Sequence, residues 1–242
     1  MRRDGASGIR RFSVIVLSEL ERTQLRLFEP EGQVSKLKRK ELRAVEKLRS
    51  KRTAALRIPG DEIRESGEAE MKRILFIGDS LIEFFDWQAR FPGHRVANLG
   101  RAGETVEGLL SRIKAITMKH PSPRLVFIMT GINNAAMEDL GFLDSYGKII
   151  DHLKAACPGA RIFVHSLLPT LLPWISDASL QEVNRSLARM AEEKGGAFID
   201  LYRLFVEGEG AAVKDYLLSD GVHLSDQGYA VWAEALEKII AL

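Results

Sequence analysis

From residue 71 onward, short apolar runs alternate along the chain with segments whose apolar positions recur at helical spacing. The runs are rich in Val, Ile, Leu and Phe, which is typical of strands buried on both faces of a parallel sheet. They predict strands at Arg73–Ile77, Arg95–Leu99, Leu125–Thr130, Arg161–Ser166 and Ala197–Leu201. The periodic segments predict helices at about 80–87, 105–119, 141–156, 179–194 and 229–241.

Five strand–helix units predict an α/β fold. We expect a three-layer α/β/α sandwich around a five-stranded, mainly parallel sheet with right-handed crossovers. Open sheets of this kind bind ligands at the carboxyl ends of their strands. The residues that directly follow each strand are therefore where chemistry is expected.

The first 70 residues follow a different pattern. Apolar positions at helical spacing among Lys and Arg predict a basic amphipathic helix at 34–57, and the Pro-Gly and acidic residues of 58–70 predict a linker. We therefore divide the chain into an N-terminal extension, 1–70, and a main domain, 71–242. A further hypothesis is that translation of the natural protein starts at Met71. We expect the helix to lie on the main domain or on a partner, with a nucleic-acid or membrane-surface role as the alternative.

Charge and cysteine content narrow the function classes. Residues 1–70 carry 17 Lys and Arg against 12 Asp and Glu, a net +5, whereas residues 71–242 carry 18 against 21, a net −3. The main domain thus gives no reason to expect nucleic acid as a partner. A single cysteine, Cys157, excludes an intrachain disulfide and a cysteine-based metal cage. No apolar run approaches the ~20 residues of a transmembrane helix, and we predict a cytoplasmic protein.

The first apolar run stops at Gly-Asp-Ser, with Ser80 its last residue, in the segment ILFIGDSLIEFF at 74–85. Serine is favoured at the N-cap of a helix, so one interpretation makes Ser80 a cap. The other makes it a nucleophile displayed at the end of a strand. A serine nucleophile needs a general base for its proton and donors for the developing oxyanion. The two roles are compatible, and we expect Ser80 to fill both.

His223 is the candidate base. It lies three residues after Asp220 in a polar turn, a spacing that lets the carboxylate reach Nδ1 and leaves Nε2 for Ser80. The alternative is a surface turn that happens to contain a histidine. The other histidines lie in or beside predicted elements, and we expect structural roles for His94, His120, His152 and His165.

Two further strand ends offer hydrogen-bond donors. Asn133 follows the third strand and carries a side-chain amide, and Gly103 follows the second with an unobstructed backbone N–H. Taken alone, each also suits an ordinary turn. Together with Ser80, Asp220 and His223 they place a nucleophile, a base with its orienting acid, and two donors at one edge of one sheet.

Four segments carry a family resemblance: ILFIGDSL, VANLGRAGET, FIMTGINN and SDGVHLSDQGY. In order and spacing they resemble the blocks of the SGNH hydrolases, or GDSL-type esterases and lipases, over about residues 72–242. The resemblance implies a flavodoxin-like sheet and a serine esterase without metal or organic cofactor. It assigns Ser80 as nucleophile, Asp220 and His223 as its triad partners, and an oxyanion hole of the Ser80 and Gly103 N–H groups and the Asn133 side chain.

One position departs from the commonest form of the third block, where Asn134 stands in place of Asp. Asn keeps the size and one acceptor but loses the charge, and we expect a modest effect. The chain also lacks Gly-x-Ser-x-Gly, because Ile82 occupies the place of the second glycine. The nucleophile elbow of the α/β-hydrolases is therefore not the template.

The expected substrate is a small or medium-chain carboxylic ester, hydrolysed through an acyl-enzyme on Ser80. Three substrate classes remain open: acetyl esters, among them those of carbohydrates; lysophospholipids; and thioesters. An apolar wall beside the site is predicted after the fourth strand at Leu171, Leu172 and Trp174, although these side chains would equally suit a cover over the core. We expect a core location for Phe84, Phe85 and Trp87.

Two other functions compete with the esterase. A nucleotide-binding protein is disfavoured because neither Gly-x-Gly-x-x-Gly nor a Gly-Lys-Ser/Thr loop is present. A non-enzymatic interaction protein, which would use the basic helix 34–57 on an inactive scaffold, is the main alternative. The expected partner is a small-molecule ester, and no oligomeric state is predicted.

Overall fold

A computed structural model describes residues 71–208 and 210–241. The N-terminal extension, with the helix and linker expected at 34–57 and 58–70, lies outside the described residues. Within them, a five-stranded parallel sheet has the order β2-β1-β3-β4-β5. Its strands are β1 (Arg73–Gly78), β2 (Arg95–Gly100), β3 (Leu125–Met129), β4 (Arg161–His165) and β5 (Ala197–Ile199). The predicted fold class is confirmed.

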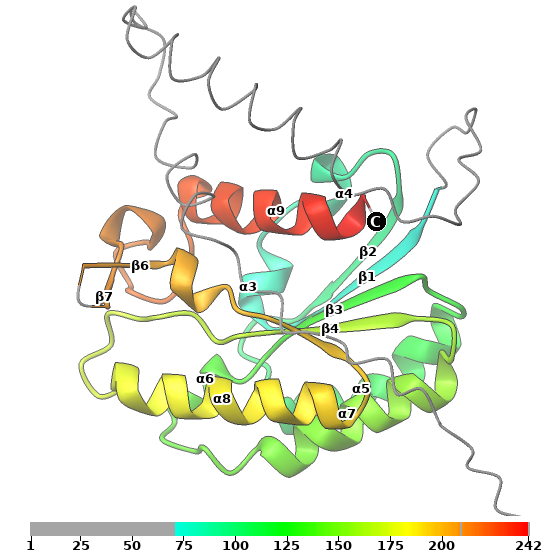
Figure 1. The fold of residues 1–242 in the computed structure, drawn as a ribbon, viewed down its shortest axis with the longest axis horizontal. Helices are drawn as coiled ribbons and strands as arrows, with labels where there is room; N and C mark the ends of the chain where they lie inside the picture. The colour runs from blue at the N-terminus through cyan, green and yellow to red at the C-terminus, as the bar shows by residue number, and fades with distance from the viewer. Residues whose placement is uncertain (1–70, 209, 242) are drawn as a thin grey trace, which may run out of the picture. The chain divides into compact units, whose positions relative to one another are not determined.

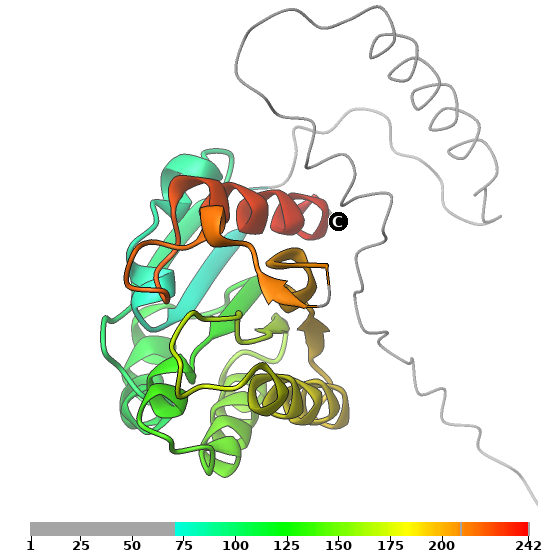
Figure 2. The same ribbon diagram turned by 90° about the vertical axis from the view of Figure 1, so that its left-hand side faces the viewer.

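Helices cover both faces of this sheet (Figures 1 and 2). On one face lies α9 (Asp226–Ile240), with α4 (Trp87–Arg90) beside it. The other face is covered by α5 (Val106–Lys119), α7 (Leu143–Ala156) and α8 (Asp177–Glu193). The three layers follow from strands whose apolar side chains point to both faces and must be covered on each.

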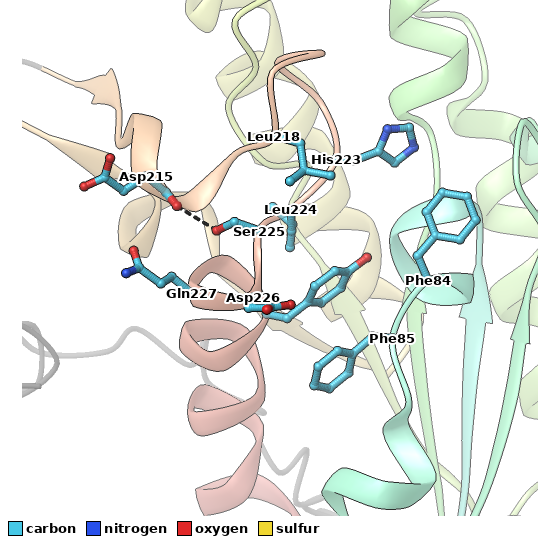
Figure 3. A pocket seen from close by; sticks show the side chains of 10 residues that line it. Phe84, Phe85, Asp215, Leu218, His223, Leu224, Ser225, Asp226 and Gln227 are labelled. Carbon is cyan, nitrogen blue, oxygen red and sulfur yellow. Dashed lines mark hydrogen bonds between the residues drawn. The ribbon is translucent and has the colours of Figure 1, made fainter. Parts of the chain in front are cut away.

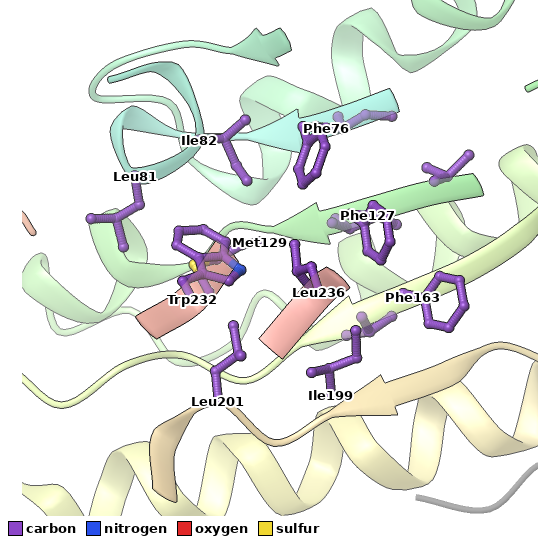
Figure 4. Close-up of a cluster of buried hydrophobic side chains, with 14 of the residues drawn as sticks. Phe76, Leu81, Ile82, Phe127, Met129, Phe163, Ile199, Leu201, Trp232 and Leu236 are labelled. Carbon is purple, nitrogen blue, oxygen red and sulfur yellow. The ribbon is translucent and has the colours of Figure 1, made fainter. Parts of the chain in front are cut away.

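A row of aromatic side chains lies between the sheet and α9 (Figure 4). Phe76, Phe127 and Phe163 stand side by side on neighbouring strands, with ring centroids 5.0 Å apart in each adjacent pair. Trp232 and Leu236 of α9 lie against this layer (Figure 4). Trp87 of α4 stacks on Phe76 at 4.1 Å, so the segment that follows Ser80 is fixed to the same core.

Several expectations about single elements were wrong. The expected helix at 80–87 is two short helices, α3 (Ser80–Glu83) and α4, and Phe84 between them is 56% exposed rather than buried. The edge strand β2 is only half-buried, although we expected a strand buried on both faces. Trp87 is buried as expected and Phe85 is partly buried.

Some elements carried no periodic signal. These are the helix α6 (Ile132–Ala136), the 3-10 turns η1 (Tyr202–Leu204) and η2 (Lys214–Tyr216), and the two-stranded pair β6 (Val206–Glu207) and β7 (Ala211–Ala212). Each is shorter than two helical turns or than a usual strand. Such segments are too short for the helical period of 3.6 residues or the strand period of 2 residues to be recognised. Both α6 and η2 lie close to the expected site in the sequence.

Candidate active site

Ser80 is the first residue of α3, directly after β1. Asp79, not Ser80, caps this helix: its Oδ1 accepts a hydrogen bond of 3.0 Å from the N–H of Leu81. The expected cap role of Ser80 was therefore wrong. As the first helical residue, Ser80 has a backbone N–H with no acceptor inside its own helix.

The turn before α9 brings His223 to Ser80. The distance between His223 Nε2 and Ser80 Oγ is 2.9 Å, and that between His223 Nδ1 and Asp220 Oδ2 is 2.7 Å. The two contacts form one hydrogen-bonded chain from a carboxylate through an imidazole to a hydroxyl. These three residues lie up to 143 positions apart in the sequence, and the structure brings them together.

Asp220 is held as a carboxylate by its own turn. Its Oδ1 accepts the backbone N–H groups of Val222 and His223, each at 2.9 Å. Desolvation raises the pKa of this carboxyl, but the hydrogen bonds from Val222 and from the backbone and ring of His223 outweigh it and lower the pKa to about 2. Asp220 therefore stays charged at every pH at which an imidazole is neutral, and its negative charge faces Nδ1.

Gly103 lies in the loop after β2, with φ of 73° and open space where a Cβ would stand. Two contacts fix this loop. The N–H of Ala102 donates to the carboxylate of Glu83 at the end of α3. Buried Glu104 accepts from Arg112 of α5, whose guanidinium also donates to the carbonyl of Leu99 at 2.8 Å. The Gly103 loop is thus tied to the helix that carries Ser80.

Asn133 lies in α6, which begins after Gly131 in the left-handed conformation, with φ of 118°. The side-chain Nδ2 donates a hydrogen bond of 2.9 Å to the carbonyl of Glu104. An amide nitrogen carries two hydrogens, so this contact orients the group and leaves its second N–H for another acceptor. The Asn133 amide and the Gly103 loop are therefore held together by Glu104.

Asn134 is buried and bonded on both sides of its amide. Its Oδ1 accepts from the N–H of Val106 at 3.0 Å, and its Nδ2 donates to Glu107 at 2.9 Å and Asp139 at 3.2 Å. Desolvation raises the pKa of Glu107, but hydrogen bonds, that from Asn134 first, lower it overall. With two carboxylates as acceptors, this position requires a donor, which an ionised Asp does not have.

Several buried polar atoms next to Ser80 have no hydrogen-bond partner among the described residues. Burial raises the pKa of Asp79 to about 7, opposed by the hydrogen bond from Leu81 and reinforced by the charge of Glu104. The second oxygen of Asp79, the hydroxyl of Thr130 and that of Tyr146 are buried with no hydrogen-bond partner in the part of the chain that the structure describes. Polar atoms that lack a hydrogen-bond partner among the described residues therefore lie in the buried surroundings of Ser80.

The segment after β4 borders the other side of the site. The N–H of Leu171 donates to the carbonyl of Gly221 at 2.8 Å, next to Asp220, and Trp174 Nε1 donates to the carbonyl of Ala136 at 3.2 Å. Leu171 and Trp174 are 44% and 55% exposed. The segment predicted to form an apolar wall thus runs from the His223 turn to α6, the helix of Asn133, and the side chains of Leu171 and Trp174 are exposed rather than packed as a cover over the core.

Sequence reasoning missed Phe84 and Leu218. The ring of Phe84 lies 5.3 Å from that of His223. The side chains of Phe84 and Leu218 line a cavity beside this histidine (Figure 3). The spacing of Phe84 from Ser80, four positions, places both on one side of a helical turn and was a usable signal. Leu218 lies in an irregular loop, and nothing in its local sequence marks it.

Comparison with known proteins then identifies the family. Residues 76–231 match the model of the GDSL-like Lipase/Acylhydrolase family. The chain belongs to this family. As a GDSL-family hydrolase it has curated relatives in the alpha1 subunits of platelet-activating factor acetylhydrolase IB. The protein from Rattus norvegicus is 27% identical over 179 residues, covering 69% of this chain and 74% of its own length.

Solved structures show the same fold. The lipase/acylhydrolase from Enterococcus faecalis superposes on this GDSL-family hydrolase with a TM-score of 0.61 at 18% identity, covering 71% of this chain and 96% of that one. A variant of the acetyl xylan esterase Axe2 from Geobacillus stearothermophilus gives 0.58 at 23% identity, covering 70% and 94%. At these identities the likeness establishes the fold alone.

Neither a membrane span nor a metal cluster is found among the described residues. No helix there is long and apolar enough to cross a membrane. Nor do the described His, Cys, Asp and Glu side chains form a group of three or more that could hold a metal ion.

Proposed function

We propose that this GDSL-family hydrolase is a serine esterase that works through an acyl-enzyme on Ser80. The observation that carries the proposal is the hydrogen-bonded chain from Asp220 through His223 to Ser80, with contacts of 2.7 and 2.9 Å. A serine hydroxyl becomes nucleophilic when a neighbouring base accepts its proton, and the base works best when a third group fixes its tautomer.

In the acylation step, His223 Nε2 accepts the proton of Ser80 as Oγ bonds to the ester carbonyl carbon. The carbonyl oxygen becomes an oxyanion, which accepts from the N–H groups of Ser80 and Gly103 and from the second N–H of Asn133. Removal of one such donor typically costs ~2.7–4 kcal/mol of transition-state stabilisation. The charge of Asp220 stabilises the imidazolium meanwhile.

Attack by Oγ gives a tetrahedral intermediate, and its collapse breaks the bond between the carbonyl carbon and the alcohol oxygen. His223 gives its proton to that oxygen, and the alcohol leaves. A water molecule then attacks the acyl-enzyme, with His223 as its base, and the acid is released as Ser80 regains its proton. The same imidazole nitrogen thus handles every proton in the cycle.

We propose a small or medium-chain ester as substrate, with an acetyl ester first among the candidates. The name of the relatives at 27% identity, platelet-activating factor acetylhydrolase, supports a short acyl group. Leu171, Leu172 and Trp174, on the segment between the His223 turn and α6, are proposed as the wall along the acyl group. Lysophospholipids remain among the candidates.

The test is hydrolysis of p-nitrophenyl esters from acetate to octanoate by the full chain. Ser80→Ala and His223→Ala should each lower kcat by several orders of magnitude, as removal of a nucleophile or its base does. Ser111→Ala, at an exposed serine of α5, is the matched control and should retain the full rate. Near-normal turnover by Ser80→Ala would refute the proposal.

A further inference from the structure

A cavity of about 660 Å³ opens beside His223 (Figure 3). Its walls come from three parts of the chain: the residues directly after α3, η2 with the loop that follows it, and the first turn of α9. The lining residues are Phe84, Phe85, Asp215, Leu218, His223, Leu224, Ser225, Asp226, Gln227 and Tyr229. Neither Gly103 nor Asn133, the proposed oxyanion donors, is among them.

The position of this cavity relative to the reacting atoms decides what it can hold. In the proposed reaction the carbonyl oxygen points to Gly103 and Asn133, whereas the alcohol oxygen must lie within reach of His223 Nε2, which protonates it. The cavity includes the histidine and excludes the donors. It therefore lies on the side from which the alcohol leaves, and the Leu171–Trp174 segment is left for the acyl group.

The lining has an apolar floor. Phe84 is 56% and Leu218 is 49% exposed, which leaves two large apolar side chains open to solvent within one cavity. Phe85 and Tyr229 also line it and stack on each other with ring centroids 4.7 Å apart. Covering Phe84 and Leu218 with an apolar group removes their surface from water and stabilises the complex.

The carboxylates that line the cavity have no Lys or Arg among the other described lining residues. Asp215 and Asp226 are exposed carboxylates, and no Lys or Arg occurs among the described residues of its lining. An anionic group on the alcohol would meet two like charges with no cation to compensate. A neutral or cationic group avoids this cost.

We propose that this cavity is the binding site for the alcohol part of the ester, and that it selects uncharged or cationic apolar alcohols over anionic ones. Phe84 and Leu218 are its specificity-determining apolar contacts, and Asp215 and Asp226 set the charge preference. The inference rests on the proposed esterase function and deepens it by defining the class of alcohol.

The experiment uses three aryl acetates that form the same acetyl-enzyme and differ only in the alcohol. These are methyl 4-acetoxybenzoate, which is neutral, 4-acetoxybenzoate, an anion, and 4-acetoxyphenyltrimethylammonium, a cation. Each kcat/KM is divided by the rate constant for hydroxide-catalysed hydrolysis of the same ester, which removes the intrinsic reactivity of the leaving group.

The corrected kcat/KM of the neutral and cationic esters should exceed that of the anionic ester by about fivefold or more, since each exposed charge contact contributes up to about 1 kcal/mol. Asp215→Asn combined with Asp226→Asn should remove most of that preference. Phe84→Ala and Leu218→Ala should each lower kcat/KM for the neutral ester about tenfold, as loss of an apolar contact in a specificity pocket does. In Leu218→Ala and the Asp double variant the rate of acetyl-enzyme hydrolysis should not change, because the alcohol has already left.

Met118→Ala, at a 74% exposed side chain of α5, is the control for loss of surface apolar area and should change nothing. Inactive Ser80→Ala together with unchanged alcohol preference in the Phe84, Leu218 and Asp variants would overturn this inference alone. Active Ser80→Ala would overturn the proposed function. A change in deacylation rather than acylation would place the acyl group in the cavity and also overturn the inference.

Discussion

The amide of Asn134 joins two elements at the residue scale. Its oxygen accepts from the first N–H of α5, and its nitrogen donates to Glu107 of α5 and to Asp139 after α6. This bonding holds α6, and with it Asn133, against the loop of Gly103 and Glu104. The commonest form of the family's third block has Asp at this position, and Asn supplies Glu107 and Asp139 with a donor that an ionised Asp lacks.

We expect Asn134→Asp to be damaging in this chain. The substitution keeps the acceptor for Val106 but removes two donors and places a third carboxylate beside Glu107 and Asp139. Loss of buried hydrogen bonds should lower the free energy of unfolding by about 1–3 kcal/mol, and displacement of Asn133 should lower kcat. Urea unfolding and p-nitrophenyl acetate turnover measure both effects.

Adding Glu107→Gln to that variant supplies a new donor to the introduced carboxylate and removes one negative charge. The double variant should recover part of both the stability and kcat. Equal stability and activity of Asn134→Asp and wild type would show that the Asn134 amide does not position α6.

At the scale of elements, α3 reaches its place because Gly100 has no side chain. A Cβ at this end of β2 would lie 2.3 Å from the backbone nitrogen of Glu83 and 2.8 Å from the carbonyl oxygen of Asp79. Other contacts anchor α3 in the same place: Asn98 donates to the carbonyl of Ile82 at 2.9 Å, and Tyr229 donates to that of Leu81 at 3.1 Å.

Gly100→Ala should therefore move α3 away from β2 and shift Ser80 relative to His223. We expect a loss of about 1–3 kcal/mol in unfolding free energy, as for other overpacked sites. A shift of about 1 Å in a reacting group can cost about a hundredfold in rate, so kcat/KM should fall by at least tenfold.

Gly93→Ala is the matched control, because a Cβ there meets no atom within 4 Å. It should leave both quantities close to those of wild type. If Gly100→Ala behaves as Gly93→Ala does, close packing of α3 on β2 is not what positions Ser80.

At the scale of the whole molecule, His165 links the sheet to α9. Its ring on β4 stacks on Phe127 with centroids 5.6 Å apart and meets the edge of Trp232 at 5.4 Å. Within the described residues, both ring nitrogens are buried without a hydrogen-bond partner. Burial lowers the pKa of His165 to about 3, so the folded protein keeps this ring neutral.

His165 should make the folded protein sensitive to acid. In the unfolded chain its pKa returns to about 6.5, so below that pH the unfolded state binds a proton that the folded state refuses. Stability from this group is present above pH 6.5 and is lost as the pH falls toward 3, by about 1.4 kcal/mol for each unit. Burial raises the pKa of Asp79 to about 7, so its contribution has the opposite pH dependence: between about pH 4 and pH 7 it increases the free energy of unfolding as the pH falls.

The comparison between wild type and His165→Leu cancels the contribution of Asp79. As the pH is lowered from 7 to 5, the free energy of unfolding of the variant, measured with urea, should rise steadily relative to that of wild type. His120→Gln, at a half-buried ring after α5, should show a much smaller gain. Parallel curves for wild type and His165→Leu would mean that the buried ring carries no such penalty.

The sequence by itself determined the parallel sheet, its helical layers and the candidate residues of the site. Uninterrupted apolar runs can be stable only when both faces of a strand are covered, and this periodicity is visible locally. The short polar segments at strand ends were recognisable because a parallel sheet collects them at one edge. Even so, the pattern misread the segment after Ser80, where one helix was expected and two were found.

Only the tertiary structure decided which groups meet. The contact of His223 with Ser80 spans 143 positions, and that of Asn133 with Glu104 spans 29, so neither distance is encoded in a local pattern. The exposure of Phe84 and Leu218 and their cavity arise where α3 approaches the loop before α9. Packing of elements remote in the chain sets such surfaces, because burial is a property of what lies opposite a side chain and not of the side chain alone.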